Sequence, residues 1–250
     1  MSVSYETEDP EELAANSVVR ASRWDDVPWF SIVLIACYTV AFVAQMGTNL
    51  DRSIILAGED KDAVIGHHEY WRMLTGSALH LNIIHYAMNT YAFYSFGRTF
   101  EVLSARVQLP IVFLLSAIGG SILSQVMNPH GISVGASGGI VGIVGYLAVY
   151  SFKRREFITS EFRRSLIFNI GFILFYGFVL VRAVDNFAHI GGLVVGAVYA
   201  LILVPKDAYA DPREASSITK TLGFASIAVY AATCLFAVLV ILRVVRFPIV

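Results

Sequence analysis

The sequence contains little charge, and this scarcity limits the kinds of protein it can encode. Only 15% of its 250 residues are charged, while 56% are hydrophobic. Soluble proteins average about 25% charged and roughly 45–50% apolar residues. The net charge of −1 gives no indication of a nucleic-acid partner, so we expect none. The composition predicts a polytopic membrane protein.

Cysteine is also scarce, and several functional signals are absent. Cys37 and Cys234 both fall in apolar stretches and do not suggest a disulfide framework. The HExxH motif of zinc metalloproteases is missing, and we expect neither a metal nor a cofactor. No cleavable signal peptide is visible, and the N-terminal segment is too acidic for a mitochondrial presequence. We therefore expect residues 1–27 to form a polar cytoplasmic tail.

Long apolar stretches, by contrast, are abundant. A membrane-spanning helix needs roughly 20 apolar residues. We predict seven such helices, over 29–47, 79–96, 107–126, 135–152, 166–181, 186–204 and 222–242. No repeat marks an inverted-repeat transporter. The predicted fold is an all-α polytopic membrane protein with a six-helix core over 28–205, followed by a linker and a seventh helix over 206–250.

Lysine and arginine are unevenly distributed between the predicted connections, and this predicts the orientation in the membrane. Most of them fall in the N-terminal tail and in the connections on its side, above all in residues 153–164. We therefore expect a cytoplasmic N-terminus and a C-terminus on the opposite side. A plasma or cytoplasmic membrane fits the N-terminal segment better than a mitochondrial one.

Two chemically active residues stand near the starts of predicted helices. Ser137 lies in the stretch Gly135-Ala136-Ser137-Gly138, and His189 opens a later helix. Serine is a weak nucleophile unless a neighbouring base takes its proton, and histidine is the usual base. Both helices enter from the outer face in the predicted topology, which places both side chains on the order of 5 Å below their outer ends. This common depth predicts a catalytic Ser–His dyad.

Glycines accompany both residues at a spacing that lets helices approach closely. Gly138 and Gly142 are four residues apart, as are Gly192 and Gly196. Such pairs form a flat helix face on which another backbone can pack. They are common packing devices, so each pair alone also fits a purely structural role. With Gly135, these glycines are the predicted packing residues near the site.

The second predicted helix supplies further polar side chains. His85 and Asn89 are four residues apart and share a helix face, whereas His80 points elsewhere. Polar side chains inside a membrane are costly, which makes them functional candidates. Asn89, His85 and the Ser137 amide are candidates for stabilising an oxyanion. The alternative for His85 and Asn89 is a bridge between helices.

The remaining acids and histidines have simpler interpretations. Asp185 precedes His189 by one helical turn, and we expect it to lie near water, where it caps the helix or pairs with Arg182. We expect His67 and His68 to be solvated, and His130 to have no partner.

Together these motifs resemble those of the rhomboid intramembrane serine proteases. The resemblance covers about residues 70–205, and the motifs follow the family's order. The matching stretches are Trp71-Arg72 with Thr75, HLNIIHYAMN from His80 to Asn89, Gly97 with Glu101, Gly135-Ala136-Ser137-Gly138, and Ala188-His189-Ile190-Gly191-Gly192 with Gly196.

This resemblance implies a six-helix rhomboid-type core with one additional C-terminal transmembrane helix. It implies that Ser137 is the nucleophile, that His189 is the base, and that Asn89, His85 and the Ser137 amide form the oxyanion hole. The substrates would be transmembrane segments of proteins in the lipid bilayer, cut near the outer face through an acyl-enzyme. No cofactor would be required.

One position departs from the family pattern, and alternatives stay open. Many family members carry an aromatic residue four positions after the serine, where this chain has Val141. A non-catalytic rhomboid-like protein that binds transmembrane helices is therefore one alternative. A small transporter or channel is another. The presence of both Ser137 and His189 favours the protease.

Overall fold

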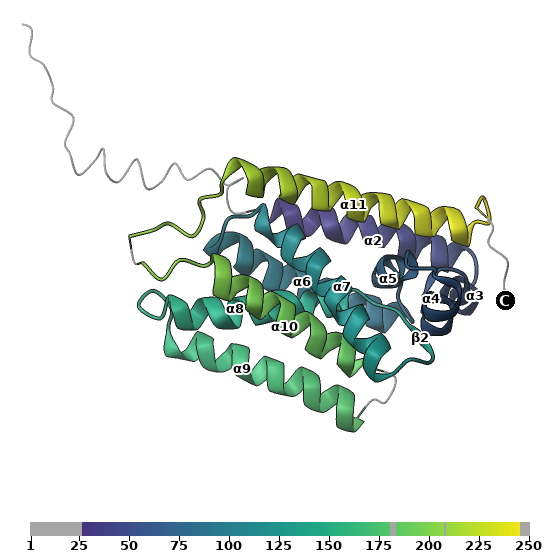
Figure 1. Cartoon of the computed structure of the whole chain (residues 1–250), viewed down its shortest axis with the longest axis horizontal. Coiled ribbons are helices and arrows are strands. Elements are labelled where there is room, and N and C mark those ends of the chain that lie inside the picture. The colour runs from purple at the N-terminus through teal and green to yellow at the C-terminus, as the bar shows by residue number, and fades with distance from the viewer. Residues whose placement is uncertain (1–26, 181–183, 208, 246–250) are drawn as a thin grey trace, which may run out of the picture.

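The computed structural model describes residues 27–180, 184–207 and 209–245, and nearly all of its regular structure is helical (Figure 1). Apart from its last residue, the predicted tail 1–27 lies outside the described residues. Helices occupy all seven predicted segments. They are α2 (Trp29–Gly47), α6 (Ile83–Leu103), α7 (Gln108–Met127), α8 (Ser137–Lys153), α9 (Ser160–Phe175), α10 (Asn186–Leu203) and α11 (Ser217–Ile241).

Three of these helices begin several residues away from the starts predicted from hydropathy. In each of them a side-chain cap sets where the helix starts. Asn82 accepts a hydrogen bond from the His85 amide, so α6 begins at Ile83 rather than at 79. Thr159 caps α9, and Ser216 caps α11. Both helices therefore start in polar sequence several residues before the apolar run. After α9 the chain continues as a π-helix, η2 (Tyr176–Leu180).

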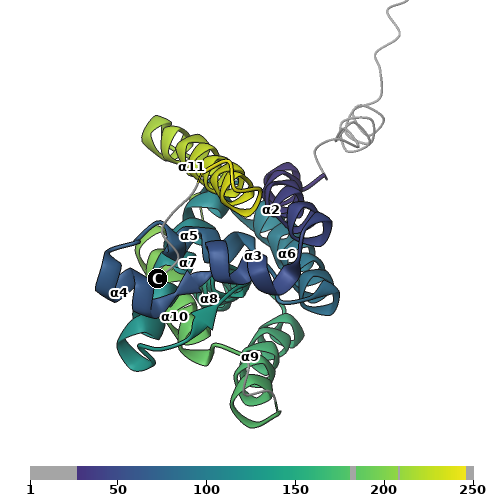
Figure 2. The same ribbon diagram turned by 90° about the vertical axis from the view of Figure 1, so that its right-hand side faces the viewer.

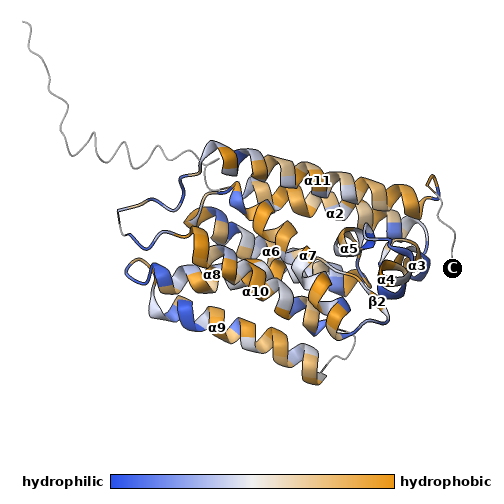
Figure 3. Cartoon of the chain, in the orientation of Figure 1, coloured by the Kyte–Doolittle hydropathy of each residue, from blue (hydrophilic) through white to orange (hydrophobic). Residues whose placement is uncertain are grey.

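Five described helical segments are long and apolar enough to span a membrane: α2, α7, Ser160–Val179, α10 and α11. Figure 3 shows hydrophobic residues along these helices and hydrophilic residues in the connections at their ends. In the bilayer core only helices and closed barrels satisfy their own backbone hydrogen bonds. The predicted class, an all-α polytopic membrane protein, is confirmed.

Helix α8 lies inside the bundle, where α10, α7, α9 and α6 pack against it. Its side chains Ile143, Val144 and Leu147 are fully buried, and α10 and α7 form its largest interfaces. Helix α9 lies on one side of the bundle (Figures 1 and 2). Helix α11 lies on the other side, against α2 and α7. The seventh predicted helix thus packs at the periphery of the bundle.

The long connection after α2 is folded. It contains α3 (Leu50–Ala57), β1 (Glu59–Asp60), α4 (Lys61–His67), α5 (Arg72–Thr75) and the 3₁₀ turn η1 (Gly76–Ala78). Strand β1 pairs antiparallel with β2 (Ile132–Ser133), and β2 lies just before α8. These elements gather at the right-hand end of the molecule in Figure 1, where α8 and α10 begin.

Candidate active site

Ser137 is the first residue of α8, and the loop before it has a restricted conformation. Gly135 has a φ of +131°, a value that residues with side chains rarely adopt. Its amide donates a 2.9 Å hydrogen bond to the carbonyl of Gly76, which fixes the loop against η1. Ala136, the N-cap residue, supplies no side-chain hydrogen bond to the helix. Ser137 is half-buried. It lies at a helix start whose free amides donate no hydrogen bond to an N-cap side chain.

His189 is the fourth residue of α10 and is buried, with 6% of its surface exposed. Within the described part of the chain, its Nδ1 atom has no hydrogen-bond partner, and no hydrogen bond joins it to Ser137. No described aromatic ring stacks on it either, and Val141, at the position where many family members have an aromatic residue, is buried.

The backbones of α8 and α10 touch at the predicted glycines. A Cβ atom on Gly192 would lie 2.0 Å from the carbonyl oxygen of Gly138, and one on Gly196 would lie 1.8 Å from that of Gly142. Both distances are far below any real contact, so only glycine fits at these two positions. The close helix approach predicted from the glycine spacing is present.

The same line of contact between α8 and α10, the seam, brings the neighbours of Ser137 and His189 together. A Cβ atom on Gly138, the residue after Ser137, would lie 3.5 Å from the carbonyl oxygen of Ala188, the residue before His189. The two helices therefore meet where both candidate side chains originate. The residue after Ser137 thus lies against the residue before His189 across this interface.

Helix α6 brings His85 and Asn89 to the loop before Ser137. A Cβ atom on Gly135 would lie 2.7 Å from Cε1 of His85 and 3.7 Å from Nδ2 of Asn89. Asn89 is buried, and its Nδ2 also donates a 3.1 Å hydrogen bond to the His85 carbonyl. His85 is half-buried, and its Nδ1 accepts a hydrogen bond from the Leu81 amide. Both predicted oxyanion residues thus lie on the Ser137 side of the bundle.

His80 has a structural environment. Its amide donates to the Gln45 side chain at 2.9 Å, and its carbonyl accepts from the same side chain at 3.2 Å. Its fully buried ring packs against Tyr38 and Tyr86. His80 therefore joins the start of the α6 segment to α2.

Asp185 is not the partner of His189. It is the N-cap of α10, and its Oδ1 accepts a 3.0 Å hydrogen bond from the Ala188 amide, as the capping prediction required. The alternative partner, Arg182, lies outside the described residues. Asp185 is half-buried, with 18% of its side chain exposed, and Lys61 from α4 pairs with its carboxylate at 3.2 Å. Lys61 could not be recognised as a partner from the sequence, since the two residues belong to distant segments.

The exposed histidines behave partly as predicted. His67 and His68 are exposed. His130 does have a partner, contrary to expectation: its Nδ1 lies 2.8 Å from a carboxylate oxygen of Asp62 on the exposed surface. The strand pair β1–β2 brings the start of α4 and the loop before β2 together.

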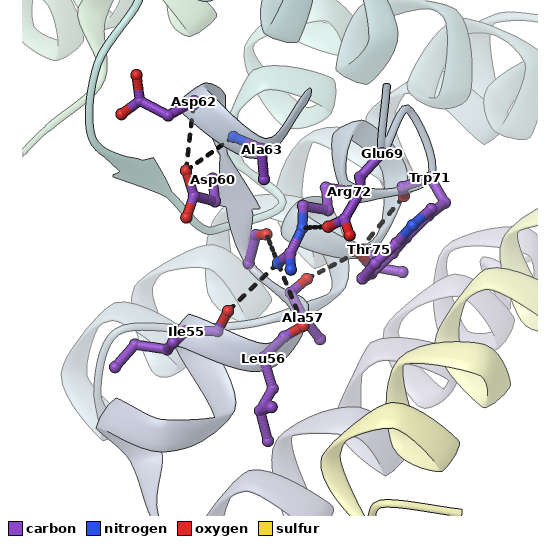
Figure 4. Close-up of polar contacts among 11 residues, drawn as sticks. Ile55, Leu56, Ala57, Asp60, Asp62, Ala63, Glu69, Trp71, Arg72 and Thr75 are labelled. Atoms are coloured by element: carbon purple, nitrogen blue, oxygen red, sulfur yellow. Dashed lines mark hydrogen bonds and ion pairs between the residues drawn. The ribbon is translucent and has the colours of Figure 1, made fainter. Parts of the chain in front are cut away.

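The tryptophan–arginine motif holds the folded connection together (Figure 4). Arg72 pairs with Glu69, and its guanidinium donates to the carbonyls of Ile55, Leu56 and Gly58 at the end of α3. Thr75 donates a 2.7 Å hydrogen bond to the Ala57 carbonyl. A positive charge at a helix C-terminus stabilises it. This motif fixes α3 on α5 and does not contact the candidate catalytic residues.

The Gly97–Glu101 motif joins α6 to the start of α2. Glu101 accepts hydrogen bonds from the Ser31 amide at 2.7 Å and from its hydroxyl at 2.6 Å, and a further one from the Phe30 amide. A Cβ atom on Gly97 would lie 2.3 Å from the Ser31 hydroxyl. The glycine thus makes room for the serine that the glutamate binds.

Comparison with known proteins identifies the family. The family model for the rhomboid domain matches residues 67–206, more than half of the chain. Rhomboid protease GluP of Bacillus subtilis is 33% identical over 183 residues, which cover 72% of this chain and 36% of that protein. RHOMBOID-like protein 6, mitochondrial, of Arabidopsis thaliana is 33% identical over 177 residues, which cover 70% of this chain and 57% of that protein.

A relative named as inactive is also similar. Inactive rhomboid protein 1 of Rattus norvegicus is 26% identical over 137 residues, which cover 55% of this chain and 16% of that protein. This chain thus covers less than two thirds of each of these three relatives. The family-model match over residues 67–206 shows that the chain belongs to the rhomboid family.

Proposed function

We propose that this rhomboid-family protein is an intramembrane serine endopeptidase that cleaves transmembrane segments with a Ser137–His189 dyad. The observation that carries this proposal is the contact of Gly138 with Ala188. It sets the residue after the serine against the residue before the histidine, inside the bundle of a membrane protein. The relative named as a protease supports the same activity.

The proposed reaction follows the chemistry of serine hydrolases. Ser137 Oγ bonds to the carbonyl carbon of the scissile peptide while His189 accepts its proton. Collapse of the tetrahedral intermediate breaks the C–N bond, and the protonated His189 gives its proton to the leaving amine. Water then attacks the ester carbonyl while His189 accepts its proton, and His189 returns that proton to Ser137 Oγ as the acyl–oxygen bond breaks and the carboxyl product leaves.

Donors for the developing oxyanion are available near the start of α8. The Ser137 amide lies at a helix N-terminus, where the backbone dipole favours negative charge. Asn89 and His85 approach from α6, next to Gly135. Fixed donors of this kind stabilise the transition state by roughly 3–4 kcal/mol each. Because Ser137 and His189 are not hydrogen-bonded here, substrate binding must bring them into contact.

The proposal includes a place for the reaction in the membrane. A substrate helix must unwind locally, because its peptide bonds are shielded by helical hydrogen bonds. Glycine and other poor helix formers lower that cost. With the N-terminus in the cytoplasm, the cut would fall near the outer face of a plasma or cytoplasmic membrane. The mitochondrial relative makes a mitochondrial membrane the alternative.

A non-catalytic role is the second candidate, and two observations favour it. His189 has no aromatic ring stacked on it among the described residues, and one similar protein is named as inactive. Such a protein would bind transmembrane helices in the same bundle without cutting them.

Cleavage of a single-pass reporter with a glycine-rich transmembrane segment separates the two candidates. For a protease, wild type cuts, while Ser137→Ala and His189→Ala each lower kcat at least about 10⁴-fold. Asn89→Ala lowers kcat about 10²–10³-fold. A fluorophosphonate probe reports on Ser137 independently of the reporter. A wild type that neither cuts nor reacts with the probe would favour the non-catalytic candidate.

A further inference from the structure

A partly buried polar cluster lies where α8 and α10 begin, beside the proposed catalytic pair. We name it the Asp185 cluster. It combines residues from the folded connection, from α7, from β2 and from the cap of α10. Its members are Glu59, Lys61, Ser121, Ser124, Gln125, Ser133 and Asp185.

The carboxylate of Asp185 joins four separate segments. Oδ1 caps α10 through the Ala188 amide. Oδ2 accepts a 2.5 Å hydrogen bond from the Ser133 hydroxyl on β2, another from the Ser124 hydroxyl on α7, and pairs with Lys61 Nζ at 3.2 Å. The hydrogen bonds and the ion pair of this carboxylate are thus with groups other than His189.

Two of these contacts adjoin the proposed catalytic residues. Ala188 immediately precedes His189, and Ser133 lies four residues before Ser137 on the strand that leads into α8. One carboxylate therefore binds both the segment that carries the serine and the helix that carries the histidine. Among the described side chains, Lys153 also links α8 to α10, through the carbonyls of Ala200 and Leu201, but it does so at the opposite end of both helices.

Lys61 is held as firmly as its partner. It is 2% exposed, and its amide donates a 3.1 Å hydrogen bond to the Gly131 carbonyl in the loop before β2. A buried ammonium is costly without a partner, and removing one member of a buried pair leaves the other uncompensated. Lys61 thus holds the folded connection over the start of α10.

The surroundings favour a charged Asp185. Burial alone would raise its pKa, but hydrogen bonds from Ser124 and Ser133 and the charge of Lys61 bring the pKa below its usual value. The neighbouring Glu59 behaves in the opposite way, because burial raises its pKa to about 7 despite hydrogen bonds from Ser121 and Gln125. The ion pair of the cluster is therefore the one between Lys61 and Asp185.

We propose that Asp185, paired with Lys61, is a positioning residue that fixes the Ser137 segment relative to His189; this inference rests on the proposed function. The catalytic groups must meet within hydrogen-bond reach, and a displacement of about 1 Å can cost on the order of 10²-fold in rate. The Lys61–Asp185 pair thereby holds the segment that carries Ser137 and the helix that carries His189 in place against the folded connection.

The test compares variants that keep or remove single contacts. Asp185→Asn retains a capping side chain but loses the charge that pairs with Lys61. Lys61→Met removes the charge from the other side, and Lys61→Arg restores it. Asp62→Asn is the matched control, since Asp62 is an exposed acid next to Lys61 that pairs with His130 outside the cluster. All variants are purified in detergent and compared at equal folded fractions.

The readouts are the rate of fluorophosphonate labelling at Ser137 and the separate kcat and KM for the reporter. Asp185→Asn and Lys61→Met should each lower the labelling rate and kcat about 10–100-fold, with KM within about twofold. Lys61→Arg should recover most of the loss, and Asp62→Asn should match wild type. The double variant, with Asp185→Asn and Lys61→Met together, should be no slower than the slower single variant, because the two substitutions remove the same interaction.

The outcomes distinguish this inference from the proposed function. If wild type labels at Ser137 and Asp185→Asn labels equally fast, the positioning role is wrong and the proposed function stands. If the loss appears in KM alone, or Lys61→Arg recovers nothing, the positioning role is again wrong. A wild type that fails to label or cut would overturn both. Should Asp185→Asn fail to fold, the Lys61→Met and Lys61→Arg pair tests the same contact.

Discussion

Helices α8 and α9 are neighbours in the sequence, yet their environments differ strongly. Almost every residue of α8 from Gly138 to Ser151 is buried, and its glycines contact the backbone of α10. In α9 only Leu166 is buried, and nothing lies within 4 Å of a Cβ atom placed on Gly171. The bundle thus has a tightly packed seam and a loosely attached outer helix.

This difference shows that glycine in a membrane helix has no fixed meaning. At Gly142 and Gly196 the missing side chain lets two backbones touch, which brings the candidate serine and histidine together. At Gly171 the missing side chain leaves open space. The same residue type is essential in one helix and replaceable in the next, and substitutions can measure this contrast.

The largest effect is expected at the seam. A Cβ atom on Gly196 would lie 1.8 Å from a backbone oxygen, which cannot move aside as a flexible side chain could. Gly196→Ala should therefore force α8 and α10 apart and destabilise the protein by about 3 kcal/mol or more. The loss would be read as a lower Tm in detergent, together with loss of fluorophosphonate labelling. A Gly196→Ala protein as stable as wild type would disprove the close backbone contact.

The next effect concerns Glu59 in the Asp185 cluster and depends on pH. The folded-state pKa of Glu59, about 7, is above its usual value of 4.5, so the folded protein binds this proton more tightly than the unfolded chain. This stabilisation is present below pH 4.5 and is lost as the pH rises through about 7. The total change is about 3 kcal/mol. Asp185 adds no slope between pH 5 and 8, because its lowered pKa keeps it ionised in both states.

Glu59→Gln provides the measurement for this prediction. Denaturation of wild type and variant is followed at pH 5 and pH 8. Wild type should lose stability relative to Glu59→Gln as the pH rises. Hydrogen exchange should locate the change at the starts of α8 and α10 and leave α9 unaffected. Equal pH profiles for the two proteins would show that Glu59 does not carry the effect.

A smaller effect is expected at the N-terminus of α2, where Glu101 of α6 binds the first turn of this helix. Glu101 accepts hydrogen bonds from Ser31 and Phe30 at the α2 N-terminus. Glu101→Gln removes the negative charge that favours this position and should destabilise the protein by about 1–2 kcal/mol. Thermal unfolding measures the loss. Asp51→Asn, at an exposed acid on α3, is the control that should stay within about 0.5 kcal/mol of wild type.

The smallest effect is expected in α9. Gly171→Ala meets no neighbour within 4 Å and exchanges a poor helix former for a good one. It should change stability by no more than about 1 kcal/mol, in the stabilising direction, and leave reporter cleavage unchanged. The comparison with Gly196→Ala uses the same chemical change in two environments. A strong loss from Gly171→Ala would mean that α9 packs more tightly than the contacts indicate.

The sequence predicted the helices well where local signals are strong. The range of α2 matched its apolar run, and the N-cap role of Asp185 followed from its place before a helix. Predictions were less accurate where polar caps extend a helix beyond its apolar run, as at Thr159 and Ser216. The His130–Asp62 pair and the Lys61–Asp185 pair were missed entirely, because each joins segments that the sequence keeps far apart.

The roles of the candidate residues divide in the same way. Ser137, His189, His85 and Asn89 were selected by residue type and spacing, and the fold brings their segments together. Their catalytic roles stay predictions until the variants are assayed. The domain boundaries over 28–205 and 206–250, and the orientation in the membrane, also remain predictions.

The sequence by itself determined the class of protein, because apolar runs long enough to cross a bilayer leave few alternatives to a helical bundle. It also determined which residues are chemically suited to nucleophile and base. Only the tertiary structure decided that Gly138 meets Ala188, that Glu101 caps α2, and that Lys61 covers Asp185. These contacts join residues far apart in the chain, and their formation depends on the packing of whole helices, which short-range sequence patterns do not encode.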